Sequence, residues 1–120
     1  MADDYKTFES QGFEILVGQG DRANDRLTFK IAQPRDFWLH VANLPGSHVV
    51  VRNPEKLPEL PKAVAERAAE LAVKHSKAKN AGGKVPVHLC RVADVSKPRR
   101  AAPGKVRLRS FEEIKVYAKD

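Results

Sequence analysis

The chain has 120 residues and a net charge of +7, so it is long enough for one domain with a modest hydrophobic core and too short for two. Apolar residues make up 42% and charged residues 31%, which is typical of a folded globular domain and excludes a wholly disordered chain. The sequence has no apolar run near the roughly 20 residues that span a bilayer, and its polar, acidic N-terminus is unlike a secretory signal peptide. We therefore expect a single domain over residues 1–120 with no membrane partner.

Cysteine content and charge distribution indicate the compartment and the partner. Cys90 is the only cysteine, so an intrachain disulfide is impossible and a reducing, cytoplasmic location is expected. Residues 1–60 carry seven Lys and Arg against nine Asp and Glu, whereas residues 61–120 carry fifteen against six. Seven of these basic residues fall within residues 91–109. Such a basic segment favours a polyanionic partner, most often a nucleic acid, although a merely solvated basic surface would show the same pattern.

Two short strands and a helix are predicted at the start of the chain. Residues 5–17 have the pattern of two strands around a Gln-Gly turn, with partial apolar alternation on the second strand. After a Gly-rich break, Asp21 or Asn24 can cap a helix that runs to about Ala32, because Asx side chains accept from unpaired N–H groups at helix starts.

A hairpin, a longer helix and further strands follow. Residues 37–41 and 47–52 are rich in aromatic and β-branched residues and are joined by a Pro-Gly turn, so they are predicted to pair. A helix is expected from about Pro61 to Lys79, with an apolar stripe on one face and a double glycine after its end. Further strands are predicted at residues 84–95, 106–109 and 114–118. Mixed elements without regular β-α-β alternation predict an α+β fold: a mostly antiparallel sheet with one long and one short helix.

The predicted hairpin carries a dense group of polar side chains. Strand alternation places Asp36, Trp38 and His40 on one face, and His48 and Arg52 on one face of the returning strand. In one interpretation Trp38 packs in the core and the histidines bond buried backbone. In the other, this face offers Trp38 for stacking and the histidines and arginine for contacts with phosphates or bases, the combination used in recognising single-stranded RNA. The residues alone leave both interpretations open.

Other kinds of site have weaker support. The histidines and the cysteine lack the spacing of a metal-binding motif, so neither a metal nor a cofactor is expected. Ser47 beside His48, with Asp36 near His40, supplies the groups of a catalytic triad, and a small hydrolase or nuclease using His40 and His48 is the alternative function. The GQG sequence at residues 18–20 precedes a helix N-terminus that could bind phosphate, but a tight turn is the favoured interpretation of these glycines.

Four stretches in order along the chain carry a resemblance to one known family. They are GQGDRANDRLTFKIA, DFWLHVANLPGSHVVVR, AAELAVKHSKAKNAGGKVPVHLCRV and VSKPRRAAPGKV. Together they resemble the NFACT-R domain, an RNA-binding domain near the C-terminus of ribosome quality control proteins. The resemblance covers about residues 8–118, which we take as the domain core. The other domains of those proteins have no counterpart in this sequence, so a stand-alone NFACT-R protein is expected.

The resemblance implies a non-enzymatic RNA-binding module that contacts tRNA, large-subunit rRNA or both, with the large ribosomal subunit as a further partner. It implies a role in translation or ribosome-associated quality control and brings no catalytic residue with it. Neither the RNA that is bound nor the oligomeric state follows from it. Arg99 and Arg100 stand where many members of that family have smaller residues, which would strengthen phosphate contacts. The predicted RNA-binding residues are Asn24, Arg26, Trp38, His40, Ser47, His48, Arg52, Lys97, Arg99, Arg100 and Lys105.

Overall fold

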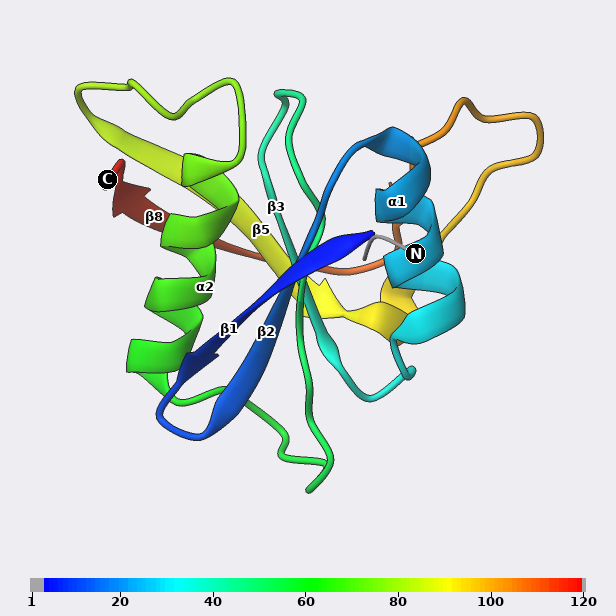
Figure 1. Cartoon of the computed structure of the whole chain (residues 1–120), viewed down its shortest axis with the longest axis horizontal. Coiled ribbons are helices and arrows are strands. Elements are labelled where there is room, and N and C mark those ends of the chain that lie inside the picture. The colour runs from blue at the N-terminus through cyan, green and yellow to red at the C-terminus, as the bar shows by residue number, and fades with distance from the viewer. Residues whose placement is uncertain (1–3, 120) are drawn as a thin grey trace.

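The computed structural model describes residues 4–119, and these form a six-stranded antiparallel sheet, a two-stranded sheet and two main helical segments (Figure 1). The large sheet has the spatial order β1 (Tyr5–Ser10), β2 (Phe13–Gly18), β4 (Val49–Val51), β3 (Phe37–Val41), β5 (Lys84–Arg91) and β8 (Glu112–Tyr117). The small sheet pairs β6 (Val95–Ser96) with β7 (Arg107–Leu108) and follows the short 3-10 turn η2 (Val92–Asp94). The helical segments are α1 (Asp21–Arg26), continued by the π-helical turn η1 (Leu27–Ile31), and α2 (Lys62–Lys74).

The predicted fold class, a mostly antiparallel α+β fold with one long and one short helix, is confirmed. Both predicted hairpins form. β1 and β2 pair around Gln11 and Gly12, which adopt the positive φ angles that a tight turn requires. β3 and β4 pair so that Leu39 lies opposite Val49, and this register brings the rings of His40 and His48 within 5.6 Å of each other. Residues 1–3 and 120 of the predicted domain lie outside the described residues.

Helix α2 covers one face of the sheet and buries the main hydrophobic core. Its apolar stripe faces the sheet, as its 3.6-residue spacing predicts. The alanines in this stripe allow a close approach to the valines of the central strands. None of the helices within residues 4–119 is long and apolar enough to cross a membrane. The buried members of the core are Ile15, Val17, Phe37, Leu39, Val41, Val49, Val51, Val64, Ala68, Ala69, Leu71, Ala72, Val73, Ala78, Val85, Val87 and Val116.

Helix α2 ends earlier than the sequence predicts, at Lys74 rather than Lys79. His75 leaves the helical region, with φ −101° and ψ 37°, and Ser76 then pairs with Gly46 in an isolated β-bridge. The Ser76 hydroxyl also bonds two backbone groups of the new turn. No glycine or proline marks this position, so the long-range pairing with Gly46 is what stops the helix.

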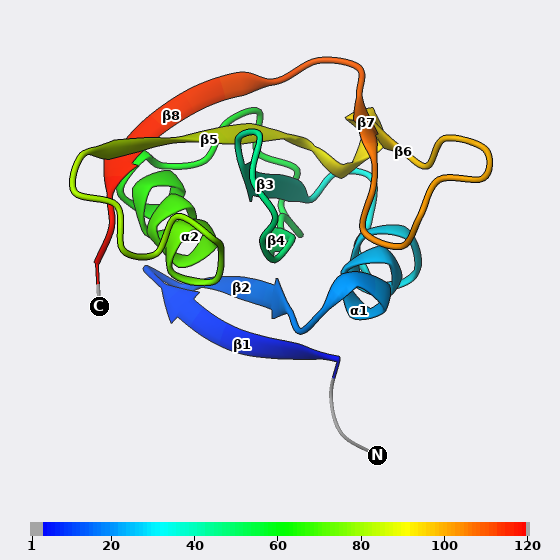
Figure 2. The same ribbon diagram turned by 90° about the horizontal axis from the view of Figure 1, so that it is seen from above.

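A second core lies on the other face of β3 and β4, so of the two interpretations of this hairpin the structure bears out the one in which Trp38 packs in the core. Trp38 and Val50, 1% and 0% exposed, pack there with Leu16, Leu27 and Cys90. Segments α1, η1 and the chain from η2 to β7 cover this face (Figure 2). Because both faces of the central strands are covered, β2 ends in a continuous apolar run instead of a clean alternation.

Three loops lie along one end of the sheet, at the top of Figure 1. They are the β3–β4 turn (residues 42–48), the loop after α2 (residues 75–83) and the basic loop, which we define as residues 97–105. The N-terminus of α1 lies at the same end. The basic segment seen in the sequence is therefore next to the histidine end of the β3–β4 hairpin.

Candidate nucleic-acid interface

A chain of hydrogen bonds runs through the second core from Trp38 to the basic loop. The indole N–H of Trp38 donates to the Thr28 hydroxyl at 3.1 Å, and this hydroxyl lies 2.8 Å from Nδ1 of His48. Nε2 of His48 lies 3.3 Å from the carbonyl oxygen of Gly104. Because a carbonyl can only accept, Nε2 carries the proton and Nδ1 accepts from Thr28. Every hydrogen bond from Trp38 to Gly104 therefore has one donor and one acceptor when His48 is neutral.

Burial keeps His48 neutral. Its side chain is 1% exposed, and this loss of hydration, together with the nearby His40, lowers the pKa of His48 to about 4. Its bond to the carbonyl of Gly104 and the charge of Asp25 only partly oppose this shift. In this position the His48 ring cannot reach a phosphate. It instead holds the basic loop against the sheet.

Asn24 and Asp21 do not cap α1, so the predicted capping role is wrong. Asn24 lies inside the helix, 2% exposed, and ties it to the β3–β4 turn just before β4. Its Oδ1 accepts the backbone N–H of His48 at 3.0 Å, and its Nδ2 donates to the carbonyl of Gly46 at 3.4 Å. A Cβ at Gly18 would lie 2.0 Å from this Oδ1, which explains the glycine there. Asn24 is thus a positioning residue.

Asp25 and Lys97 fix the basic loop to α1. One carboxylate oxygen of Asp25 accepts the backbone N–H of Gly104 at 3.0 Å, and the other lies 2.9 Å from the ammonium nitrogen of Lys97. The same ammonium donates to the carbonyls of Ala102 and Lys105, at 2.5 Å and 2.9 Å. An ammonium has three protons, and here each has an acceptor. Lys97 therefore organises the loop from within.

Replacing Lys97 with methionine should loosen the basic loop without unfolding the domain. Methionine keeps the apolar stem but loses the three bonds, and because Lys97 and Asp25 are 29% and 25% exposed, we expect a local loss of only about 1 kcal/mol. Hydrogen exchange at the amides of Ala101 and Lys105, which bond within the loop, should speed up several-fold. The matched control is Arg109→Met, which breaks the exposed Asp94 pair nearby. Equal exchange in both variants would contradict the anchoring role.

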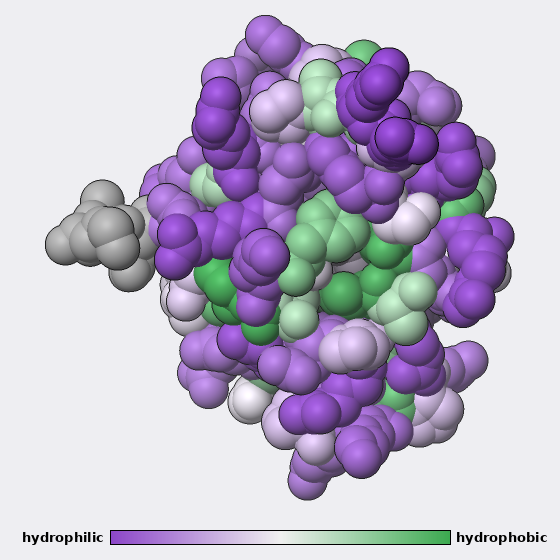
Figure 3. Space-filling view, turned by 90° about the vertical axis from the view of Figure 1, so that its right-hand side faces the viewer, coloured by the Kyte–Doolittle hydropathy of each residue, from purple (hydrophilic) through white to green (hydrophobic). Residues whose placement is uncertain are grey.

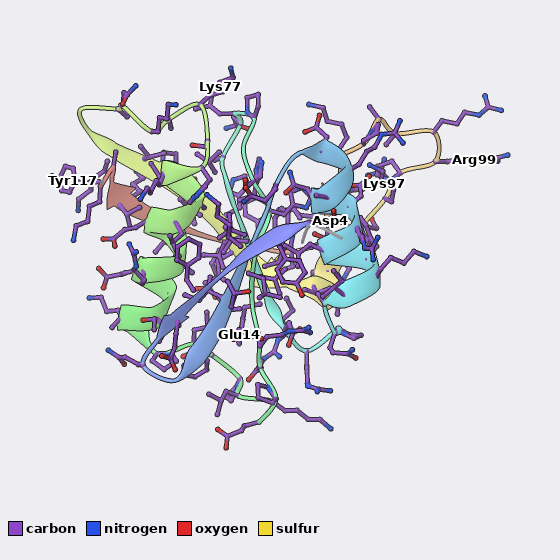
Figure 4. The ribbon with its side chains drawn as sticks, viewed as in Figure 1. Asp4, Glu14, Lys77, Lys97, Arg99 and Tyr117 are labelled. Atoms are coloured by element: carbon purple, nitrogen blue, oxygen red, sulfur yellow. The ribbon has the colours of Figure 1, made fainter. Side chains whose placement is uncertain are left out.

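The other predicted cations of the basic loop face solvent. Arg99, Arg100 and Lys105 are exposed, and Figure 4 shows Arg99 extending away from the body of the protein. Hydrophilic residues cover most of the neighbouring face, around a small apolar patch (Figure 3). Phe29 belongs to η1 on this side and is 36% exposed. These arginines are free to approach a polyanion because the ends of the loop are already held.

Arg52 lies apart from that group, whereas Arg26 lines a surface pocket together with Lys97 of the basic loop. Arg52 donates to the buried carboxylate of Asp36 at 3.2 Å and lies 3.8 Å from Glu14, which Figure 4 places at the opposite end of the sheet from Arg99. The structure therefore does not bring Arg52 together with the basic loop. Arg26 is exposed on α1 and pairs with Asp4 at 3.3 Å.

The groups of the alternative hydrolase or nuclease do not assemble. The Ser47 hydroxyl donates to the carbonyl of Gly18 at 2.6 Å, and both ring nitrogens of His48 have other partners. Asp36 accepts from Arg52 and from two backbone N–H groups, so it is not the carboxylate partner of His40 that a catalytic triad would need. Burial raises the pKa of Cys90 to about 12, which keeps it an unreactive thiol. Within residues 4–119 no cluster of three or more metal-ligating side chains is present.

A groove beside the basic loop brings together residues that the sequence analysis did not single out. It has a volume of about 660 Å³ and lies between the β3–β4 turn and residues 103–111. Predicted residues His40 and Lys105 line it, together with His88, Leu44 and Phe111. His88 lies opposite His40 in the β3–β5 pairing, a contact over 48 positions of sequence that no local pattern reveals. Exposed Phe111, between two predicted strands, was the one available signal.

Comparison with known proteins places this geometry in a family. The family model described as "NFACT protein RNA binding domain" matches residues 4–110. The chain is 42% identical over 102 residues to the Rqc2 homolog RqcH of Bacillus subtilis (strain 168), and 33% identical over 116 residues to that of Streptococcus pneumoniae serotype 2. These matches cover 84% and 97% of this chain but 17% and 19% of the relatives, so the chain spans less than a fifth of their length.

A solved structure agrees with the sequence matches. The C-terminal part of the fibronectin/fibrinogen-binding protein from Streptococcus suis is similar to this fold with a TM-score of 0.88 and 31% sequence identity. The similarity covers 100% of this chain and 47% of that one. The four stretches on which the resemblance rested all lie at least partly within the matched residues 4–110. The chain therefore belongs to the NFACT RNA-binding domain family.

Proposed function

We propose that the chain is an RNA-binding module that contacts tRNA or large-subunit rRNA in ribosome-associated quality control. Membership of the RNA-binding family and the RqcH relatives support the class of function. The main support for the position of the RNA-binding site is the structure of the basic loop. The bonds of Lys97 and Gly104 fix the ends of this loop, while Arg99 and Arg100 stay exposed. Fixed ends lower the entropy lost when the loop is ordered on a polyanion.

In this proposal the predicted RNA-binding residues fall into two groups according to their position, one that contacts RNA and one that supports the first. Contacts come from the residues that are exposed or half-buried near the basic loop, and the buried ones hold these in place. A cytoplasmic location, a non-enzymatic role and a single domain over residues 1–120 accompany the proposal as predictions. The proposed contact residues are Arg99, Arg100, Lys105, His40, Ser47 and Arg26, and the proposed supporting residues are Asn24, Trp38, His48 and Lys97, whereas Arg52 belongs to neither group.

Reversing both loop arginines, as Arg99→Glu with Arg100→Glu, should weaken RNA binding by at least about tenfold at moderate salt. Each neutralised phosphate adds roughly 0.7 to 0.9 to the slope of log affinity against log salt, so the slope should fall by about 2. Fluorescence anisotropy with labelled tRNA over a salt series measures both quantities. Sedimentation of lysate through a sucrose gradient, at low and raised salt, tests the large ribosomal subunit as the carrier of the RNA.

The matched control reverses two exposed lysines elsewhere, Lys62 on α2 and Lys115 on β8. It changes the net charge equally, so a general electrostatic effect would weaken binding as much as the loop variant does. Equal losses would remove the basic loop from the proposal. If the wild type neither binds tRNA nor moves with large subunits at low salt, the proposed function is wrong.

A further inference from the structure

The groove beside the basic loop has the size and lining of a small-ligand site. Its volume of about 660 Å³ falls in the range of roughly 300–1,000 Å³ usual for such sites. Leu44, Pro45 and Gly46 of the β3–β4 turn form one wall, and residues 103–111 form the other. Its floor comes from β3 and β5, through residues such as His40 and His88, and therefore from the central sheet. A site on a rigid floor with one wall in the basic loop can accept part of a ligand whose charge that loop attracts.

Phe111 gives this groove an aromatic surface that the fold leaves partly exposed. Its ring lies 4.2 Å from the ring of His88, yet half of its surface is exposed. Leu44, on the opposite wall, is 42% exposed. Exposing apolar groups on both sides of a groove costs free energy unless a flat, apolar ligand enters between them. Stacking on exposed aromatic side chains is how proteins commonly hold unpaired bases.

The polar groups in the groove suit the edge of a base. His40 is held from two sides, because its ring stacks on Trp38 at 5.9 Å and meets His48 edge-on at 5.6 Å. Burial, and then the neighbouring His88 and Lys105, lower the pKa of His40, while its contacts with the backbone of Gly46 and Val41 oppose this. A neutral imidazole whose N–H bonds the backbone keeps one acceptor nitrogen, and the amino group of a base can donate to it.

Charged groups at the groove fit the rest of a nucleotide. Lys105 is exposed and lines the groove, and its carbonyl is held by Lys97 at 2.9 Å, which fixes its backbone. Its ammonium can therefore neutralise a phosphate next to a bound base. Asp21 also lines the groove, and its carboxylate can accept the amino group of a base.

We propose that this groove holds one unpaired nucleobase of RNA, stacked on Phe111, with Lys105 on the adjacent phosphate. This inference deepens the proposed RNA-binding function and rests on it. A paired base inside a duplex is stacked on both faces and cannot enter such a groove, so the ligand is a loop, bulge or single-stranded end. The domain then combines two kinds of contact with RNA. The basic loop contacts the phosphate backbone of the RNA, and the groove binds only a base that is unpaired.

Two labelled RNAs test the inference: a short blunt-ended duplex of two strands, which has no unpaired base, and the same duplex with a single-stranded 3′ overhang containing 2-aminopurine. Phe111→Ala should weaken binding of the overhang RNA about tenfold, by loss of one stacking contact, and leave binding of the blunt duplex unchanged. Phe111→Tyr should keep the affinity. On wild-type protein the 2-aminopurine fluorescence should be quenched by stacking, and in Phe111→Ala it should not be.

The matched control is Tyr117→Ala, which removes an exposed aromatic side chain from the far end of β8 and outside the groove. Equal weakening by both alanine variants would overturn the inference. If Phe111→Ala binds both RNAs as wild type does while Arg99→Glu with Arg100→Glu weakens both, the groove inference is wrong and the proposed RNA binding stands. Failure of the wild type to bind either RNA at low salt overturns both. Binding of a peptide in the groove, displaced by neither RNA, would assign it to a protein partner instead.

Discussion

Replacing Asp36 with alanine should destabilise the domain by about 4 kcal/mol, because this carboxylate joins three segments. It is 1% exposed and accepts from the backbone N–H groups of Gln33 and Asn53, at 2.9 Å and 2.8 Å, and from Arg52 at 3.2 Å. Each buried donor left without an acceptor costs about 1–3 kcal/mol, and breaking a buried ion pair from one side costs about 3–5 kcal/mol. We discount that sum because the Arg52 side chain is 29% exposed.

Urea denaturation measures this loss, and thermal unfolding should show a fall in Tm on the order of 15 °C. Glu14→Ala is the matched control, since Glu14 faces the same Arg52 but at 3.8 Å and with 56% of its side chain exposed. An exposed pair of this kind contributes well under about 1 kcal/mol. Similar losses in the two variants would show that Asp36 acts only as a charge partner of Arg52, and not as the acceptor that joins the segments.

Lowering the pH from about 7 to about 4 should remove about 3 kcal/mol of stability through His48 alone. The pKa of His48 is about 4 in the folded protein against 6.5 for an unburied histidine. Between these values the unfolded chain binds a proton that the folded protein does not. Stability is therefore full above about pH 6.5 and falls as the pH drops through this window, by about 1.4 kcal/mol for each pH unit.

Other groups also titrate between pH 4 and 7, so the measurement compares wild type with His48→Gln. Glutamine cannot complete the bonds to both Thr28 and Gly104, so the variant is less stable at pH 7. Because it cannot be protonated, the difference in unfolding free energy should shrink by about 3 kcal/mol on going to pH 4. A difference that stays constant with pH would mean that His48 has the same pKa in the folded and the unfolded protein.

The elements could be predicted from the sequence because each depends on local chemistry. The Gln11-Gly12 turn, the β3–β4 hairpin and the start of α2 follow from turn residues and apolar periodicity, and all three were correct within a few residues. The basic loop was likewise visible as a run of charge. The family resemblance rested on residues that the fold brings together, since Asn24, Asp25, His48 and Gly104 bond one another directly or through the backbone.

The predictions failed where a contact joins distant parts of the chain. Nothing near Trp38 in the sequence shows that α1 and η1 will cover it, so its burial could not be decided from the sequence. The end of α2 depends on a bridge between Gly46 and Ser76, which are 30 positions apart. Asp25 was missed for the same reason, because its partners Lys97 and Gly104 lie more than 70 positions away. The alternation of residues along a strand shows on which face of the sheet a residue lies, but it does not show which segment covers that face.

The anchoring of the basic loop at Lys97 and Gly104 separates a constant frame from a replaceable segment. The contacts that hold the loop are made at these two ends, on α1 and on His48. Before Ala102, whose carbonyl also accepts from Lys97, residues 98–101 can change in length and composition at little cost to folding, as exposed loops generally do. Exchange of this short segment is therefore the simplest route by which such a domain could acquire a new partner, in nature or by engineering, while the rest of the chain stays the same.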